Sequence, residues 1–324
     1  MIQPISLSSA EGRRIAADIR NRFAEATDDA CREAVTDILA RVRREGDAAV
    51  LAYCCPFDCP LMALETLRVS AEEFAQAERE VDDEFRRTLR FAADRVRRFH
   101  EREMEDSWLL TREDGAVTGR LVRPVDSAGL YVPGGKEGST PLVSSVLMNG
   151  IPAQIAEVGR RVIVTPPGRD GRVNPALLVA AQEIGIDEVY KVGSAWAVAA
   201  LAYGTATIPR VDVIVGPGNQ YVAEAKRQVM GRVRIDMIAG PSEVLIIADG
   251  TGSASFAAAD LLAQAEHDET ASAVLLTPDA GFAQAVAAEV ERQLEGLSRK
   301  GIASRSLAAF GAAVVTRDLA EAVV

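Results

Sequence analysis

Two glycine-rich loops are the segments of this sequence best suited to binding a ligand. G-L-Y-V-P-G-G (Gly129–Gly135) follows a strand-like run, and V-G-P-G-N-Q-Y (Val215–Tyr221) connects a strand-like run to a helix-like run. Glycine lets the backbone approach a ligand closely, and a helix N-terminus attracts anions. Contact with phosphate or a nucleotide is therefore one interpretation, and a tight turn without a ligand is the other. Neither loop reads G-x-G-x-x-G, so the usual dinucleotide fingerprint is absent.

Further along the chain, polar side chains occupy a loop and a helix end. Ser242 lies at the tip of A-G-P-S-E-V-L, where a serine is more often a turn former than a nucleophile. Gln264 and His267 are three residues apart and share a helix face. They could give a metal one oxygen and one nitrogen, although zinc usually takes three or four protein ligands. A single histidine at a helix C-terminus is also favoured by the helix dipole alone.

Strand-like and helix-like segments alternate through the last two thirds of the chain. The predicted strands are Arg161–Pro166, Glu188–Val192, Val211–Val215, Glu243–Asp249, Ser272–Pro278 and Ala312–Thr316. The helices predicted between them include Pro175–Ile184, Ala195–Tyr203 and Ser253–His267. Continuous β-branched runs are typical of parallel strands buried on both faces, so the pattern predicts a doubly wound α/β protein. Two blocks are visible, one ending near Ile238 and one beginning near Glu243.

The first third of the chain is mainly helical. Residues Thr27–Tyr53 have helical periodicity with a break at Gly46. A second helix is predicted to begin at Ser70, where S-A-E-E forms a capping box, and to continue past Phe99. Strand-like alternation follows over 119–132.

Composition limits the classes of partner. The chain has 36 basic and 47 acidic residues and a net charge of −11, which disfavours the phosphate contacts of a nucleic-acid-binding protein. The N-terminus lacks the apolar core of a signal peptide, and no apolar run reaches the ~20 residues that span a bilayer. Four cysteines, three of them in C-C-P-F-D-C, have no C-x-x-C spacing. Reduced thiols in a cytoplasmic protein are the favoured interpretation.

Six motifs in one order make the chain resemble histidinol dehydrogenases. They are GLYVPGG, SSVLMN-x-IPA, ALAYGT, GPGN-x-YV-x-EAK, ID-x-x-AGPSEVL and QAEH. The resemblance implies two incomplete Rossmann-like domains with parallel sheets, an N-terminal helical arm and a homodimer. The domain boundaries expected on this basis are an arm over 1–25, a first domain over 26–129 with 243–324, and a second domain over 130–242.

The resemblance also implies an activity and roles for individual residues. Members oxidise L-histidinol to L-histidine through the aldehyde, with two hydride transfers to NAD and a bound zinc ion, as the last step of histidine biosynthesis. Tyr131 and Asn219 would contact NAD and Ser242 would contact the substrate. Gln264 and His267 would bind both zinc and substrate.

Two departures from the family pattern leave a second enzyme activity as an alternative. Trp196 stands where the family typically has a glutamine that touches NAD, so a nucleotide contact there would differ in kind. The loop Lys136–Ser145 is longer than usual. Both features are compatible with a related NAD-dependent dehydrogenase of another small polar alcohol, such as a sulfonated diol.

The last residues suggest that the chain is truncated. A helix beginning after Thr316 reaches Val324 without a stop signal. By the resemblance, a Glu–His general-base pair, two further zinc ligands and a small C-terminal domain are expected beyond Val324. Because a positioned base contributes 10²–10⁴-fold to the rate, the chain alone is expected to be inactive. A non-catalytic nucleotide-binding partner is the alternative from another class.

Overall fold

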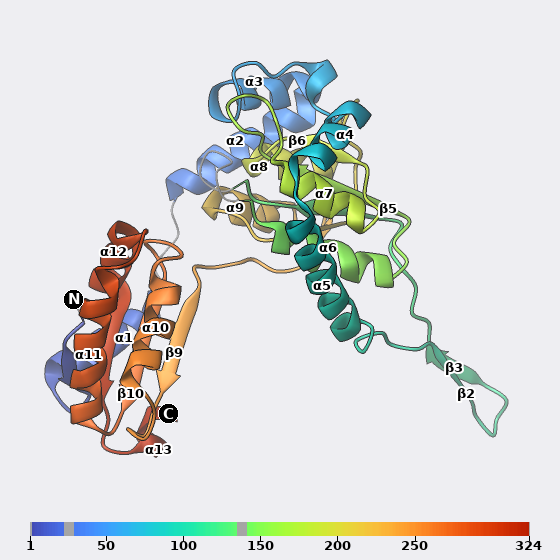
Figure 1. Cartoon of the computed structure of the whole chain (residues 1–324). Helices are drawn as coiled ribbons and strands as arrows, with labels where there is room; N and C mark the ends of the chain where they lie inside the picture. The colour runs from blue at the N-terminus through green and yellow to red at the C-terminus, as the bar shows by residue number, and fades with distance from the viewer. Residues whose placement is uncertain (1, 23–28, 135–140, 324) are drawn as a thin grey trace. The chain divides into compact units, whose positions relative to one another are not determined.

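The computed structural model describes residues 2–22, 29–134 and 141–323, which form two compact units (Figure 1). Unit 1 comprises Met1–Thr27 and Gly240–Val324, and unit 2 comprises Asp28–Ala239. The division between Ala239 and Gly240 falls where the two predicted blocks meet.

The predicted domain boundaries differ from these units. The segment after Asp28 was expected to join the C-terminal block, whereas α2 packs against α8 and α9 inside unit 2. The first residues are not a separate arm either, because β1 pairs with β11 in the sheet of unit 1. Alternation along a sequence shows which elements form, but it does not show which sheet a helix packs on.

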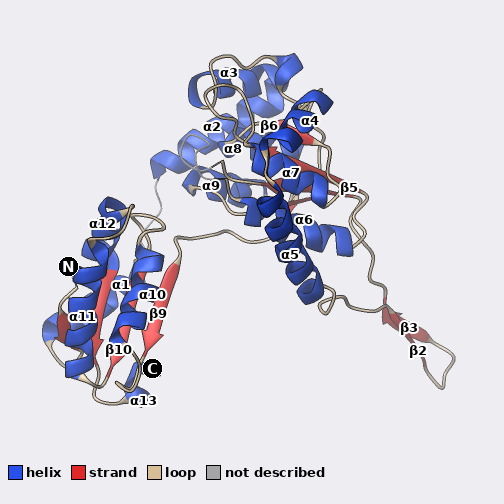
Figure 2. Cartoon of the chain, viewed as in Figure 1, coloured by secondary structure: helices blue, strands red, loops and turns tan. Residues whose placement is uncertain are grey.

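Unit 1 is a four-stranded parallel sheet in the order β1-β11-β10-β9, flanked by helices on both faces (Figure 2). Its elements are β1 (Pro4–Ser6), α1 (Ala10–Asn21), β9 (Glu243–Ile247), α10 (Ala254–Ala265), β10 (Ser272–Thr277), α11 (Ala280–Leu294), α12 (Lys300–Phe310), β11 (Gly311–Val315) and α13 (Leu319–Val323). Alternate residues of β10 serve the two faces. Leu275 packs in the cluster under α10, α11 and α12, and Val274 packs in the cluster that includes α1.

Unit 2 is built on a five-stranded parallel sheet in the order β6-β5-β4-β7-β8, with a separate antiparallel hairpin of β2 and β3. The helices of unit 2 are α2 (Asp29–Glu45), α3 (Asp47–Phe57), the 3-10 turn η1 (Leu64–Thr66), α4 (Ala71–Glu80), α5 (Asp83–His100), α6 (Val143–Ile155), α7 (Pro175–Glu183), α8 (Ser194–Tyr203) and α9 (Gln220–Val229). The strands are β2 (Trp108–Thr111), β3 (Val117–Arg120), β4 (Ser127–Tyr131), β5 (Arg160–Thr165), β6 (Val189–Lys191), β7 (Val213–Val215) and β8 (Arg234–Ile235).

The five-stranded sheet has a hydrophobic core on each face. Val162 and Val164 of β5 pack with α2, α3, α8 and α9, and Ile163 between them packs with α4, α5, α6 and α7. Both faces are covered, which explains why the strands read as continuous apolar runs. The prediction of a doubly wound α/β architecture with parallel sheets is confirmed.

Two predicted elements are each divided in the structure. The capping box at Ser70 is confirmed, since Glu73 N donates to Ser70 Oγ over 3.2 Å and Ser70 N donates to Glu73 Oε2 over 3.0 Å. The helix it begins ends at Glu80, however, and a second helix follows because Asp82 Oδ1 accepts from Phe85 N and caps it. The strand-like run over 119–132 similarly contains the end of β3 and all of β4. Within the described residues, no helix is long and apolar enough to cross a membrane.

Candidate functional site

The first candidate surface is the carboxyl edge of the unit 2 sheet, where ligands of open parallel sheets bind. Tyr131 ends β4 and Val215 ends the neighbouring strand β7. Gly216 follows with φ of +113°, and a Cβ built on it would lie 2.1 Å from the carbonyl oxygen of Tyr131. Only glycine allows the two strand ends to approach this closely in that conformation. Both glycine-rich loops therefore meet at one edge, as far as the described residues extend. Residues 135–140, which include the first half of the loop predicted over Lys136–Ser145, lie outside them.

Tyr131 is fixed in the interior of this edge. Its side chain is buried, and its hydroxyl accepts a hydrogen bond from Ser194 N over 3.0 Å. Burial raises the pKa of Tyr131, so the hydroxyl stays protonated. Ser194, at the start of α8, has a φ of +49°, which is uncommon for a residue other than glycine. The Tyr131 hydroxyl holds this backbone in place and keeps its own proton available for a further acceptor.

Asn219 caps helix α9. Its Oδ1 accepts from Tyr221 N and Val222 N, each over 3.1 Å, so the side-chain oxygen serves the fold. The asparagine is exposed, and its Nδ2 makes no hydrogen bond with a described residue. The backbone N–H groups of Gly218 and Gln220 likewise have no acceptor among the described residues. The helix start therefore presents several donors to an anionic group.

Trp196 lies in the interior beside α3. Its indole is 6% exposed and stacks on Tyr53 with ring centroids 5.6 Å apart. Its Nε1 donates to Asp58 Oδ2 over 3.1 Å, and burial raises the pKa of Asp58. The ring also contacts Phe57. The indole N–H and part of the ring surface are thus used inside unit 2, which leaves less of Trp196 for a cofactor than its sequence position suggests.

The second candidate surface is the amino edge of the unit 1 sheet. Ser242 immediately precedes β9 and is exposed, and its carbonyl oxygen accepts from Ser272 N of β10 over 3.1 Å. Helix α10 returns toward this edge before β10 begins, so Gln264 in its last turn and His267 just beyond it belong to the same edge. His267 N donates to Gln264 O over 3.1 Å, and the His267 side chain is exposed.

No further metal-binding side chains complete a site with Gln264 and His267 in the part of the chain that the structure describes. No group of three histidine, cysteine, aspartate or glutamate side chains comes together among the described residues. Neither the Gln264 amide nor the His267 ring makes a hydrogen bond within the described chain, so both side chains are available to bind a ligand. Cys54 and Cys59 are fully buried free thiols, and burial raises the pKa of Cys54.

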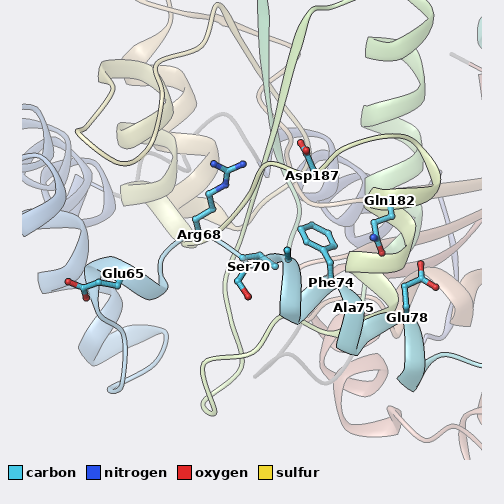
Figure 3. Close-up of a pocket in the computed structure, with 10 residues that line it drawn as sticks. Glu65, Arg68, Ser70, Phe74, Ala75, Glu78, Gln182 and Asp187 are labelled. Atoms are coloured by element: carbon cyan, nitrogen blue, oxygen red, sulfur yellow. The ribbon is translucent and has the colours of Figure 1, made fainter.

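Unit 2 also contains a hollow of about 820 Å³ (Figure 3). Its polar lining includes Arg68, Ser70 and Gln182, with three carboxylates from Glu65, Glu78 and Asp187. Figure 3 shows Glu65 and Glu78 on opposite sides of Ser70, so the acidic groups do not converge on one point. None of the residues predicted to bind a ligand lines this hollow.

Comparison with known proteins decides the family. The family model described as histidinol dehydrogenase matches residues 21–324. The histidinol dehydrogenase of Desulfotalea psychrophila is 62% identical over 323 residues, which cover 100% of this chain and 74% of that protein. The chain belongs to the histidinol dehydrogenase family. The histidinol dehydrogenase of Geobacillus kaustophilus is 53% identical, over 90% of this chain and 68% of the relative.

A solved histidinol dehydrogenase agrees with this membership in three dimensions. The crystal structure from Elizabethkingia anophelis matches with a TM-score of 0.89 and 37% identity, and covers 99% of this chain and 72% of that one. The family resemblance expected from the six motifs is therefore confirmed. The alternatives of a sulfonated-diol dehydrogenase or a non-catalytic partner are not borne out by these matches. The chain spans about three quarters of the length of the Desulfotalea psychrophila relative.

Sequence reasoning missed the residues that support the unit 2 edge. Lys226 and Asp236 hold the backbone of Gly216, and Asp58 holds Trp196. Lys226 lies in a helix among other charged residues, which is the pattern of a solvated helix face. The available signal was its spacing of seven and eight residues from Asn219 and Gly218, which turns a helical side chain back toward the loop.

Proposed function

We propose that this chain carries out the oxidation of L-histidinol to L-histidine with NAD as hydride acceptor and zinc as bound metal. The observation that carries the proposal is membership of the histidinol dehydrogenase family at 62% identity across the whole chain. The groups at the two sheet edges support it. The N–H groups at the start of α9 suit a phosphate, and the side chains of Gln264 and His267 suit an imidazole or a metal. When bound, NAD supplies the hydride acceptor and zinc supplies a Lewis acid.

In unit 2, the proposed role of the chain is to bind and orient the cofactor. Gly218 and Gln220 N–H groups and Asn219 Nδ2 would donate to it at the start of α9, where the helix dipole favours negative charge. Tyr131 would contact it through its buried hydroxyl, whose proton is retained. Trp196 would shape this edge from within.

In unit 1, the proposed role is to hold the substrate and the metal. Gln264 would offer its amide oxygen and His267 a ring nitrogen, which are ligand types that zinc accepts. Ser242 would contact the substrate from the loop before β9. A general base is not assigned among the described residues.

The test uses the sequence's only two histidines, His267 and His100. The protein expressed from its complete coding sequence is assayed for NADH formation from L-histidinol and for bound zinc. We expect His267→Ala to lower both zinc affinity and turnover by about 100-fold, the upper range for a disturbed ligand environment. His100→Ala is the matched control, since His100 is the last residue of α5 in unit 2 and its Nδ1 pairs with Glu103. No NADH formation from L-histidinol by the zinc-loaded wild type would refute the proposed activity.

We also propose that the protein is a cytoplasmic homodimer and that the hairpin of β2 and β3 takes part in the interface. Both strands are exposed along their whole length, and Trp108, Leu109, Leu110 and Val117 are 55%, 78%, 58% and 59% exposed. An isolated two-stranded hairpin is at best marginally stable in water. A second copy of the chain would cover these apolar side chains.

Replacing Leu109 by aspartate is expected to weaken self-association by about tenfold or more, because a carboxylate would have to lose its water in the interface. Sedimentation over a dilution series measures the change. Leu61→Asp is the control, because Leu61 is 77% exposed but lies outside the hairpin. Equal effects of the two substitutions would remove the hairpin from the interface.

A further inference from the structure

We infer that the ion pair between the buried Lys226 and the more exposed Asp236 positions the glycine loop that binds NAD, an inference that rests on the proposed function. Lys226 lies in α9, seven residues after Asn219, and Asp236 directly follows β8 at the edge of the sheet. Lys226 is among the largest fully buried side chains of the protein, and its Nζ pairs with Asp236 Oδ1. Removing a lysine ammonium from water is costly, so its partners identify what it does.

Lys226 and its ion-pair partner Asp236 both bind the backbone of Gly216. Lys226 Nζ donates to the carbonyl oxygen of Gly216 over 2.8 Å, and Asp236 Oδ2 accepts from Gly216 N over 2.8 Å. The ion pair therefore binds both polar backbone groups of Gly216, one with each charge. Because hydrogen bonds to charged groups are the strong ones, the two peptide units that flank Gly216 are fixed in orientation.

Fixing Gly216 determines which loop donors can reach a ligand. The N–H of Gly216 is consumed by Asp236, and Pro217 has none. The donors that remain are those of Gly218, Asn219 and Gln220, which have no acceptor among the described residues. The side chain of Asn149 on α6 adds an independent observation. Its Nδ2 is buried without a partner and lies 3.1 Å from the Cβ position of Gly216.

Asn149 Nδ2 thus lies beside Gly216, and the loop donors without an acceptor follow Gly216 within four residues of the chain. A buried amide without an acceptor is uncommon in a native protein, and a ligand oxygen would satisfy it. Lys226 does not need to touch the cofactor for this purpose. It is a positioning residue, because its ammonium group binds the backbone of Gly216 and its partner Asp236.

The test compares Lys226→Met with Lys191→Met by calorimetric titration of NAD and of L-histidinol. Lys191 is a matched control, because it is also buried and pairs with Glu73. It lies on β6, which is the outer strand of the same sheet on the side away from β8. We expect Lys226→Met to raise the Kd for NAD about tenfold or more, the scale of a lost charged hydrogen bond. We expect its Kd for L-histidinol to change less than about twofold, since the residues proposed to bind the substrate lie in unit 1.

A second variant keeps the test decisive if Lys226→Met does not fold. Asp236→Asn retains an oxygen for Gly216 N–H while removing the charge that pairs with Lys226, and it should weaken NAD binding in the same direction. Folded variants that bind NAD as tightly as the wild type would overturn the inference. Equal weakening by Lys191→Met would also overturn it. A wild type that does not bind NAD would instead refute the proposed function, and the inference with it.

Discussion

Replacing Gly216 by alanine is expected to destabilise unit 2 by about 2–5 kcal/mol and to weaken NAD binding at least tenfold. Two costs combine at this position. Alanine is strained at a φ of +113°, at roughly 1–2 kcal/mol for a backbone on the left-handed side. Its Cβ would also lie 2.1 Å from the Tyr131 carbonyl oxygen, and relieving such overpacking typically costs about 1–3 kcal/mol.

Gly231→Ala separates these two costs. Gly231 has a φ of +95° in the same unit, but nothing lies within 4 Å of its Cβ position. We expect this control to lose only about 1–2 kcal/mol, the strain alone, and to bind NAD normally. Urea unfolding measures the stabilities and calorimetry measures the affinity. If the two substitutions cost the same, the contact between Gly216 and the end of β4 has no energetic role.

The glycine loops show how far the sequence could predict this site. Their type and their place after strands indicated contact with a ligand at a sheet edge, and both loops do lie at the carboxyl edge of one sheet. The partner of Gly216 could not be predicted, because Tyr131 is 85 residues away and only the pairing of β4 with β7 brings them together. The contact of Asp236 with Gly216 could not be predicted either, because it depends on the pairing of the short outer strand β8 with β7.

Helix assignments were more secure than domain assignments for a physical reason. Periodicity and capping are local, so Ser70 could be identified as a helix start from four residues. Docking depends on which apolar faces fit together, and α2 carries Val35, Ile38 and Leu39 toward α8 and α9 rather than toward the C-terminal sheet. Nothing in those side chains distinguishes one apolar surface from another before the sheets exist.

Trp196 illustrates a residue whose role changes once its neighbours are known. The family resemblance placed it at a cofactor contact that would differ in kind. In the structure its N–H is bonded to Asp58 and its ring is stacked on Tyr53. Trp196→Ala is therefore expected to destabilise unit 2 by about 3–5 kcal/mol through the cavity it leaves. The Asp58 carboxylate would lose a donor as well, which adds about 1–3 kcal/mol.

Trp196→Phe divides the expected loss into packing and hydrogen bonding. Phenylalanine keeps a ring against Tyr53 but leaves Asp58 without the indole N–H, so we expect a loss of about 1–3 kcal/mol. Burial already raises the pKa of Asp58 in the folded protein. A raised folded-state pKa makes stability fall as the pH rises through it, and losing the donor raises that pKa further. The deficit of Trp196→Phe in urea unfolding should accordingly be larger at neutral pH than in acid. A deficit that is the same at both pH values would mean that Asp58 does not depend on Trp196 for its charge.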